Sequence, residues 1–147
     1  MTRCEFYSII RGDAPAEILF RNEHAIAILD VRPIHRGHVL VIPLRHAGNF
    51  LDVPAADCDG LFRALRLVTH AVVDALRPPG FNVFSNNGEA AGQSVFHFHF
   101  HATPRYHDDN NRFVLELKSY QPHEMSEYGR RIREAIGDPG RPDHIRP

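Results

Sequence analysis

Three histidines alternate with three phenylalanines near residue 100, and these side chains have the clearest capacity for chemistry. The segment reads VFHFHFH at residues 95–101. Successive side chains of a β-strand point to opposite faces, so a strand here would place His97, His99 and His101 together. Same-face neighbours lie about 6.6–7 Å apart, close enough for two imidazoles to contact one phosphate-sized group. We predict that the phenyl face packs on the core and that the imidazoles line a cleft or face solvent.

A row of three histidines has three interpretations. It can be a half-exposed strand without a function, a metal site, or a catalytic site for phosphoryl transfer. In the last case a neutral imidazole attacks phosphorus, and an imidazolium protonates the leaving group or holds a phosphate oxygen. The preceding loop favours phosphoryl chemistry. Gly88 and Gly92 permit close backbone approach to a ligand, and Asn86, Gln93 and Ser94 offer neutral hydrogen-bonding groups.

The rest of the sequence predicts strands in hairpin order with one long helix inserted, and these elements must position the histidine row. Apolar residues recur at helical spacing from Leu61 to Leu76 and predict a helix over residues 54–77, with Asp52 as its N-cap. This order predicts an antiparallel α+β domain with a sheet of about five strands. The other predicted elements are a short helix over 3–12, strands over 17–20, 24–29, 38–42, 81–85 and 95–103, a short strand over 112–117 and a helix over 122–136. We expect one domain over residues 1–136 and a flexible tail rich in Pro and Gly over 137–147.

Composition excludes several classes of protein. The chain has 147 residues, with 17 Lys+Arg against 18 Asp+Glu, and this balance argues against a nucleic-acid partner. No apolar run approaches the length of about 20 residues that a membrane span needs, so we expect no membrane partner. Two cysteines cannot build a disulfide framework, and the first residues do not resemble a signal peptide. We therefore expect a cytoplasmic protein.

The chain resembles the histidine triad (HIT) superfamily from residue 4 to about residue 109. The signature is His-apolar-His-apolar-His followed by two apolar positions, and HFHFHAT at 97–103 matches it except at Thr103. Further matches are FYSIIRGDAPAEILFRNEHAIAILD at 6–30, RGHVLVIPLRH at 36–46, AGQSVFHFHFH at 91–101 and HATPRY at 101–106. The resemblance implies an antiparallel sheet with a long helix. It also implies a homodimer that joins two subunits, through that helix and a strand, into a continuous sheet.

The resemblance implies a role for each matching residue. His99 would attack the α-phosphorus and form a nucleotidyl-histidine, and His101 would contact the phosphate and the departing group. His97 would support the hydrogen-bond network, and His38 matches the fourth histidine of the site. Nucleotide-binding positions are Asp30 at the ribose hydroxyls, Asn86 near ribose and phosphate, Gln93 and Ser94 near the leaving group, and Phe6, Ile28 and Val31 around the base.

The implied function is a nucleotidyl hydrolase or transferase that releases a nucleoside monophosphate from a purine nucleotide conjugate. The conjugate would be a phosphoramidate, a dinucleoside polyphosphate or an adenylylated adduct, and no cofactor is expected. The alternative is a non-catalytic nucleotide-binding or interaction protein on the same fold.

A structural zinc site is not expected. Some bacterial members carry Cys-x-x-Cys near the N-terminus, which joins two histidines around zinc. Here Cys4 remains, Tyr7 takes the second place, and His46 and His97 match the histidine partners. Three ligands are one short of a closed tetrahedral site.

Overall fold

The computed structural model describes residues 4–111, 116–137 and 140. It consists of two compact units, Met1–Asn111 and Arg112–Pro147, and each is considered by itself below. No helix within the described ranges is long and apolar enough to cross a membrane. The predicted division at residue 136 remains a prediction, and most of the predicted tail lies outside the described residues.

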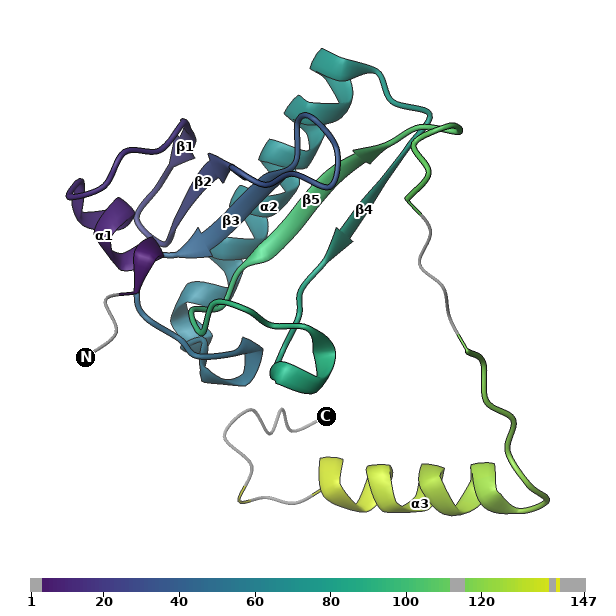
Figure 1. Ribbon diagram of the computed structural model, residues 1–147. Helices are drawn as coiled ribbons and strands as arrows, with labels where there is room; N and C mark the ends of the chain where they lie inside the picture. Colours follow the sequence, from purple (N-terminus) through teal and green to yellow (C-terminus); the bar gives the residue numbers. More distant parts are fainter. Residues whose placement is uncertain (1–3, 112–115, 138–139, 141–147) are drawn as a thin grey trace. The chain divides into compact units, whose positions relative to one another are not determined.

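A five-stranded antiparallel sheet forms the centre of the first unit (Figure 1). The strands follow the order β1-β2-β3-β5-β4, and every neighbouring pair is antiparallel. Their bounds are β1 Ile18–Arg21, β2 Ala25–Leu29, β3 Val39–Pro43, β4 Gly80–Phe84 and β5 Phe100–Arg105. With the long α2 (Ala55–Leu76) and the short α1 (Glu5–Arg11), this arrangement confirms the predicted α+β class.

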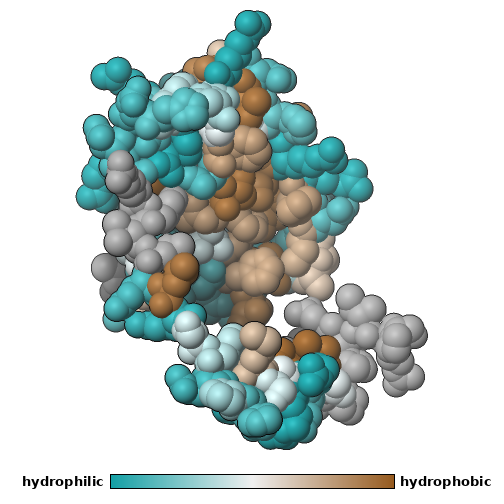
Figure 2. Space-filling view, turned by 90° about the vertical axis from the view of Figure 1, so that its right-hand side faces the viewer, coloured by the Kyte–Doolittle hydropathy of each residue, from teal (hydrophilic) through white to brown (hydrophobic). Residues whose placement is uncertain are grey.

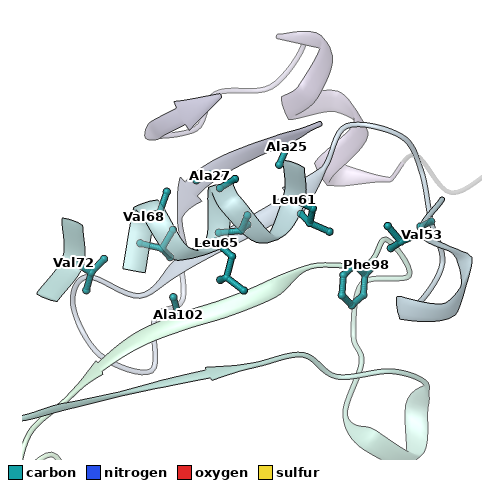
Figure 3. Close-up of a cluster of buried hydrophobic side chains, with 13 residues drawn as sticks. Ala25, Ala27, Val53, Leu61, Leu65, Val68, Val72, Phe98 and Ala102 are labelled. Atoms are coloured by element: carbon teal, nitrogen blue, oxygen red, sulfur yellow. The ribbon is translucent and has the colours of Figure 1, made fainter. Parts of the chain in front are cut away.

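Both faces of the sheet are covered at β2 and β3, because these two strands are apolar on both sides. In β2, Ala25 and Ala27 belong to the cluster of buried residues with α2, whereas Ile26 and Ile28 belong to the cluster with α1. The small alanines leave room for the large side chains of α2, which include Leu61, Leu65, Val68 and Val72 (Figure 3). The α1 face of the sheet is filled by Phe6 and Ile9 together with Leu40 and Ile42 of β3.

Helix α2 follows its predicted periodicity with two differences at the ends. Leu76 is 43% exposed and does not complete the buried face. Asp52 does not cap the helix, because it lies in a separate 3-10 turn, Phe50–Asp52, where its carboxylate accepts the N–H of Asn49 at 3.1 Å. Pro54 occupies the N-cap position without a side-chain cap.

The predicted strand over residues 95–103 is only partly correct. Strand β5 begins at Phe100, and residues 95–99 precede it outside the sheet. The pairing with β3 stops at the Val41–Phe100 partners, and β3 ends at Pro43, which has no N–H to continue a ladder. Phe98 is fully buried, but Phe96 is 53% exposed and does not anchor the segment on the core.

The second unit contains helix α3 (Glu124–Ile136), close to the predicted bounds of 122–136. None of its residues is buried. Arg130 forms ion pairs with Glu127 and Glu134 along its surface, at 2.6 Å each. The strand predicted over 112–117 falls mostly on residues 112–115, which lie outside the described residues.

Candidate active site

A pocket of about 400 Å³ lies on the α1 face of the sheet. It is bounded by the start of α1, the end of β2 with the following loop, and the segment that leads into β5. The predicted site residues that line it are Phe6, Ile28, Asp30, Val31, Ser94, His99 and His101. Four others, His38, His97, Asn86 and Gln93, are not among its lining residues. Sequence reasoning missed Glu5, Ile9, Arg32, Leu40 and Val95, which also line it.

His99 is held in a form suited to nucleophilic attack. Its Nδ1 lies 2.8 Å from the carbonyl oxygen of His97, and because a carbonyl only accepts, Nδ1 carries the proton. The lone pair is therefore on Nε2. Burial lowers the pKa of His99, a residue that is only 7% exposed, so the neutral form dominates near pH 7. Phe6 packs edge-on against this ring, with centroids 5.0 Å apart.

A chain of hydrogen bonds fixes the proton positions on His38 and His101. The backbone N–H of Ile34 donates to Nδ1 of His38 at 3.1 Å, so the proton of His38 is on Nε2. That Nε2 lies 2.9 Å from Nδ1 of His101, which must accept. The proton of His101 is consequently on its Nε2. Burial, then the nearby His99 and His38, lower the pKa of His101 to about 4, and burial also lowers the pKa of His38.

The ring of His101 is further fixed by Phe84, a contact that no sequence pattern indicated. Phe84 of β4 lies directly opposite His101 of β5 in the antiparallel register. The two rings stack with centroids 4.5 Å apart and an interplanar angle of 9°. The ring of His99 also lies beside that of His101, with centroids 4.7 Å apart. The two candidate catalytic rings are therefore adjacent.

His97 lies away from this pocket in a fully buried position. Its Nε2 donates to the carbonyl of Pro43 at 3.0 Å, so its Nδ1 accepts the thiol of Cys4 at 3.4 Å. Burial lowers its pKa. His97 thus ties the segment before β5 to the end of β3 and presents its carbonyl to His99. The predicted supporting role is compatible with this position.

Among the residues that the structure describes, two groups of side chains have ligand atoms within 4.8 Å of one another and could hold a metal ion. One comprises Cys4, His46 and His97, the same three residues considered from the sequence. The other comprises Asp30, His38 and His101. Each supplies three ligands, whereas a closed structural zinc site uses four.

The polar loop before β5 is organised by Gln93 from inside. Its side-chain N–H groups donate to the carbonyls of Gly48 at 2.7 Å and Val95 at 3.1 Å, and its oxygen accepts the N–H of Gly88 at 2.7 Å. Asn86 donates weakly to the carbonyl of Gly92 at 3.5 Å. The amide of Gln93 is therefore fully engaged with backbone groups, and Ser94 is the exposed polar side chain of this loop that lines the pocket.

Asp30 lies where the chain leaves β2 toward the pocket. One of its oxygens accepts the N–H of Arg32 at 2.8 Å, and the other is 3.5 Å from Nδ1 of His38. Its side chain is 18% exposed, so one edge of the carboxylate remains accessible from the pocket.

Comparison with known proteins places this geometry in a family. The model of the HIT domain matches residues 11–108. The Bacillus subtilis protein hit is 42% identical over 103 residues, 70% of this chain and 71% of that protein. Adenylylsulfatase HINT3 of Arabidopsis thaliana is 37% identical over 106 residues, 72% of this chain and 54% of that protein.

Similar solved structures support the same family. A member of the HIT family from Bacillus subtilis has a TM-score of 0.84 at 34% identity, covering 90% of this chain and 96% of that chain. A histidine triad nucleotide-binding protein from Candida albicans has a TM-score of 0.81 at 26% identity, covering 90% and 96%. The alternating histidines, the fold that carries them and these matches lead to one conclusion: the chain belongs to the HIT domain family of the histidine triad superfamily.

Proposed function

We propose that this protein is a nucleotidyl hydrolase or transferase that cleaves purine nucleotide conjugates at the α-phosphate through a nucleotidyl-histidine. One observation carries the proposal. The lone pair on Nε2 of His99 and the N–H on Nε2 of His101 belong to adjacent rings that line one pocket. A nucleophile and a hydrogen-bond donor are thus available to a single phosphorus centre.

In the first step, Nε2 of His99 attacks the α-phosphorus. A nitrogen–phosphorus bond forms, the bond from phosphorus to the leaving group breaks, and its electron pair departs with the leaving group. His101 donates a hydrogen bond from its Nε2–H to the departing atom and stabilises the charge that develops there. The ring keeps this proton, and the leaving group takes its own proton from the solvent. His99 keeps its Nδ1–H, so the nucleotidylated ring becomes cationic. The carbonyl of His97, at 2.8 Å, stabilises that cation.

In the second step, a water molecule attacks the same phosphorus. The new oxygen–phosphorus bond replaces the nitrogen–phosphorus bond, and the electron pair of the broken bond returns to Nε2 of His99. A nucleoside monophosphate leaves. The proton lost by the water passes to the solvent or to the departed group, and the enzyme is restored with His99 neutral.

The rest of the pocket suits a nucleoside. Phe6, Ile28 and Val31 supply the apolar surface on which a purine would lie, and the accessible edge of Asp30 would accept the ribose hydroxyls. Ser94 would lie on the leaving-group side.

We also propose a homodimer and a cytoplasmic location. Apolar side chains form a strip on the side of the first unit where β4 lies (Figure 2). Phe62 on α2 with Phe81 and Val83 on β4 contribute to a groove of about 320 Å³ there, and all three are more than 40% exposed. An exposed apolar face on an edge strand and a helix suits a second copy of the chain.

The cysteines support the proposed cytoplasmic location. Cys4 and Cys58 are both unpaired, as thiols are in a reducing compartment.

The test is a panel of three substrate classes with different leaving groups. The protein is incubated with an adenosine phosphoramidate of lysine, a diadenosine polyphosphate and adenylyl sulfate, and AMP release is measured. We include adenylyl sulfate because a relative is named as an adenylylsulfatase. We expect AMP from at least one of the three, and a mass increase of one adenylyl group on the rapidly acid-quenched enzyme.

The matched variants are His99→Ala and His107→Ala. His99→Ala should abolish turnover and the adduct, because it removes the nucleophile. His107 is an exposed residue of the turn after β5, so His107→Ala controls for the loss of a histidine elsewhere. Nucleotide binding with turnover equal in wild type and His99→Ala would instead support the non-catalytic alternative.

A further inference from the structure

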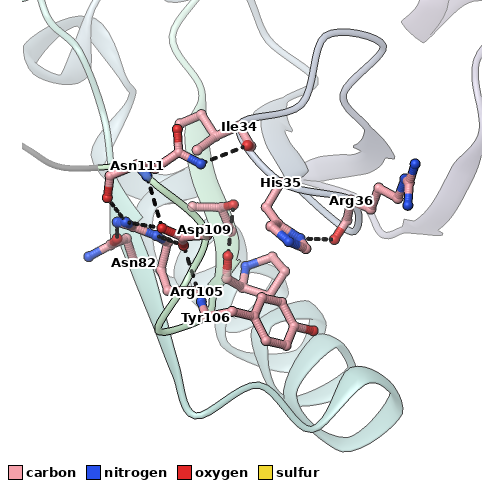
Figure 4. A network of polar contacts seen from close by, with 10 residues as sticks. Ile34, His35, Arg36, Asn82, Arg105, Tyr106, Asp109 and Asn111 are labelled. Carbon is pink, nitrogen blue, oxygen red and sulfur yellow. Dashed lines mark hydrogen bonds and ion pairs between the residues drawn. The ribbon is translucent and has the colours of Figure 1, made fainter.

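The C-terminal end of the first unit is held by a network of polar contacts outside the pocket (Figure 4). Arg105 donates to both carboxylate oxygens of Asp109, at 2.6 and 3.0 Å, and to the side-chain oxygen of Asn82 at 2.6 Å. Asp109 in turn accepts the N–H of Tyr106 at 3.1 Å and of Asn111 at 3.0 Å. The carboxylate is only 4% exposed, and the Arg105 guanidinium holds its pKa far below the ordinary value.

This network fixes Asn111 with its side chain toward the loop that precedes β3. Arg105 also donates to the carbonyl of Asn111, so the residue is held from both its N–H and its C=O. The side-chain amide of Asn111 then donates an N–H to the carbonyl of Ile34 at 3.1 Å. A second contact joins the same two segments, because Tyr106 packs on His35 with ring centroids 4.6 Å apart.

Ile34 connects this network to the site. Its carbonyl accepts Asn111, and its N–H donates to Nδ1 of His38. His38 is 2% exposed, and its Nε2 lies 2.9 Å from Nδ1 of His101. The position of the proton on His38 therefore determines its position on His101. If the loop moved, His38 would be free to carry its proton on Nδ1, with the carboxylate of Asp30 3.5 Å away. His101 would then have to donate from Nδ1 and would lose the N–H on Nε2.

We propose that Asn111 is a positioning residue for the reaction: through Ile34 and His38 it keeps the proton of His101 on the nitrogen that faces the substrate. Asn111 does not line the pocket and acts only through these hydrogen bonds. This inference rests on the proposed function for its effect on turnover. Its effect on the proton positions of His38 and His101 is independent of any substrate.

The experiment compares wild type with Asn111→Asp and Asn111→Leu. Both are close in size to Asn and remove the amide N–H that reaches Ile34. Asp108→Asn is the control, because Asp108 is an exposed residue of the same turn. The first readout is the nitrogen NMR spectrum of uniformly ¹⁵N-labelled protein at pH 7. In wild type the Nδ1 signals of His38 and His101 should have the shifts of unprotonated nitrogens, and Nε2 those of protonated ones.

In both Asn111 variants we expect these signals to move toward the average of the two tautomers, while Asp108→Asn keeps the wild-type spectrum. Loss of one positioning hydrogen bond should lower kcat by about 3- to 10-fold, with KM changed by less than about twofold. Urea unfolding of each variant verifies that it is folded under assay conditions. Unchanged tautomers in two folded variants would overturn the inference even if activity fell. Failure of every substrate would overturn the proposed function, whereas the NMR result would still decide the role of Asn111.

Discussion

Lowering the pH from 7 to 5 should destabilise this fold through the buried histidines of the site. The pKa of His101 is about 4 in the folded protein against an ordinary value of 6.5. Between these values the unfolded chain binds a proton that the folded chain excludes, so the free energy of unfolding rises with pH in this window. The stabilising contribution is therefore present above pH 6.5 and is lost as the pH falls toward 4.

The size of the effect follows from the same two values. At pH 5 the unfolded form of His101 is almost fully protonated and the folded form largely neutral, which removes about 2 kcal/mol of stability relative to pH 7. His38, His97 and His99 also have pKa values lowered by burial, so the wild-type protein should lose more than this single contribution.

The assay is urea unfolding at a series of pH values for wild type, His101→Gln and the exposed-site control His107→Gln. Wild type and His107→Gln should lose stability in parallel between pH 7 and 5. His101→Gln should lose about 2 kcal/mol less over the same interval, because glutamine does not titrate. An identical loss in His101→Gln and wild type would refute the reasoning.

Four further predictions concern the core, the loop before β3, the ribose contact and the cysteine group. Leu65→Ala should lower the free energy of unfolding by about 2–5 kcal/mol in urea titrations, because Leu65 is 4% exposed in the cluster between α2 and the sheet. Gly37→Ala should lower the melting temperature, since Gly37 has a φ of +90°, a conformation that alanine rarely adopts, and the end of the Leu76 side chain must shift to admit a Cβ; an unchanged melting temperature would contradict the strain. Asp30→Asn should weaken AMP binding about 10-fold by calorimetry and leave 2′,3′-dideoxy-AMP unaffected, as expected if the carboxylate binds the ribose hydroxyls. Protein purified without an affinity tag should contain well under one zinc per chain by elemental analysis, because Cys4, His46 and His97 supply three ligands; a stoichiometric content in wild type that is lost in Cys4→Ser would show that the trio suffices.

Much of the fold was predictable because hydrophobic periodicity reports burial directly. The spacing from Leu61 to Val72 gave the buried face of α2, and the apolar runs of β2 and β3 gave strands covered on both sides. The start of β5 was harder to predict than the bounds of β3, since the position of a strand end depends on its partner strand. Phe96 illustrates this: its alternation with His97 predicted a buried ring, but it lies before the point where pairing with β3 begins.

The candidate site was likewise only partly predictable from the sequence. The sequence by itself indicated that His99 and His101 would lie side by side, because alternation along one extended segment places them on the same face. It also predicted His97 beside them, but residues 95–99 precede β5, and His97 is buried away from the pocket. It did not determine which nitrogen of each ring carries the proton. That depends on the N–H of Ile34 and on the carbonyl of His97. His38 and His101 are 63 residues apart, and only the folded sheet brings their nitrogens within 2.9 Å. Backbone donors and cross-strand neighbours leave no mark on side-chain patterns, so tertiary structure alone decided them.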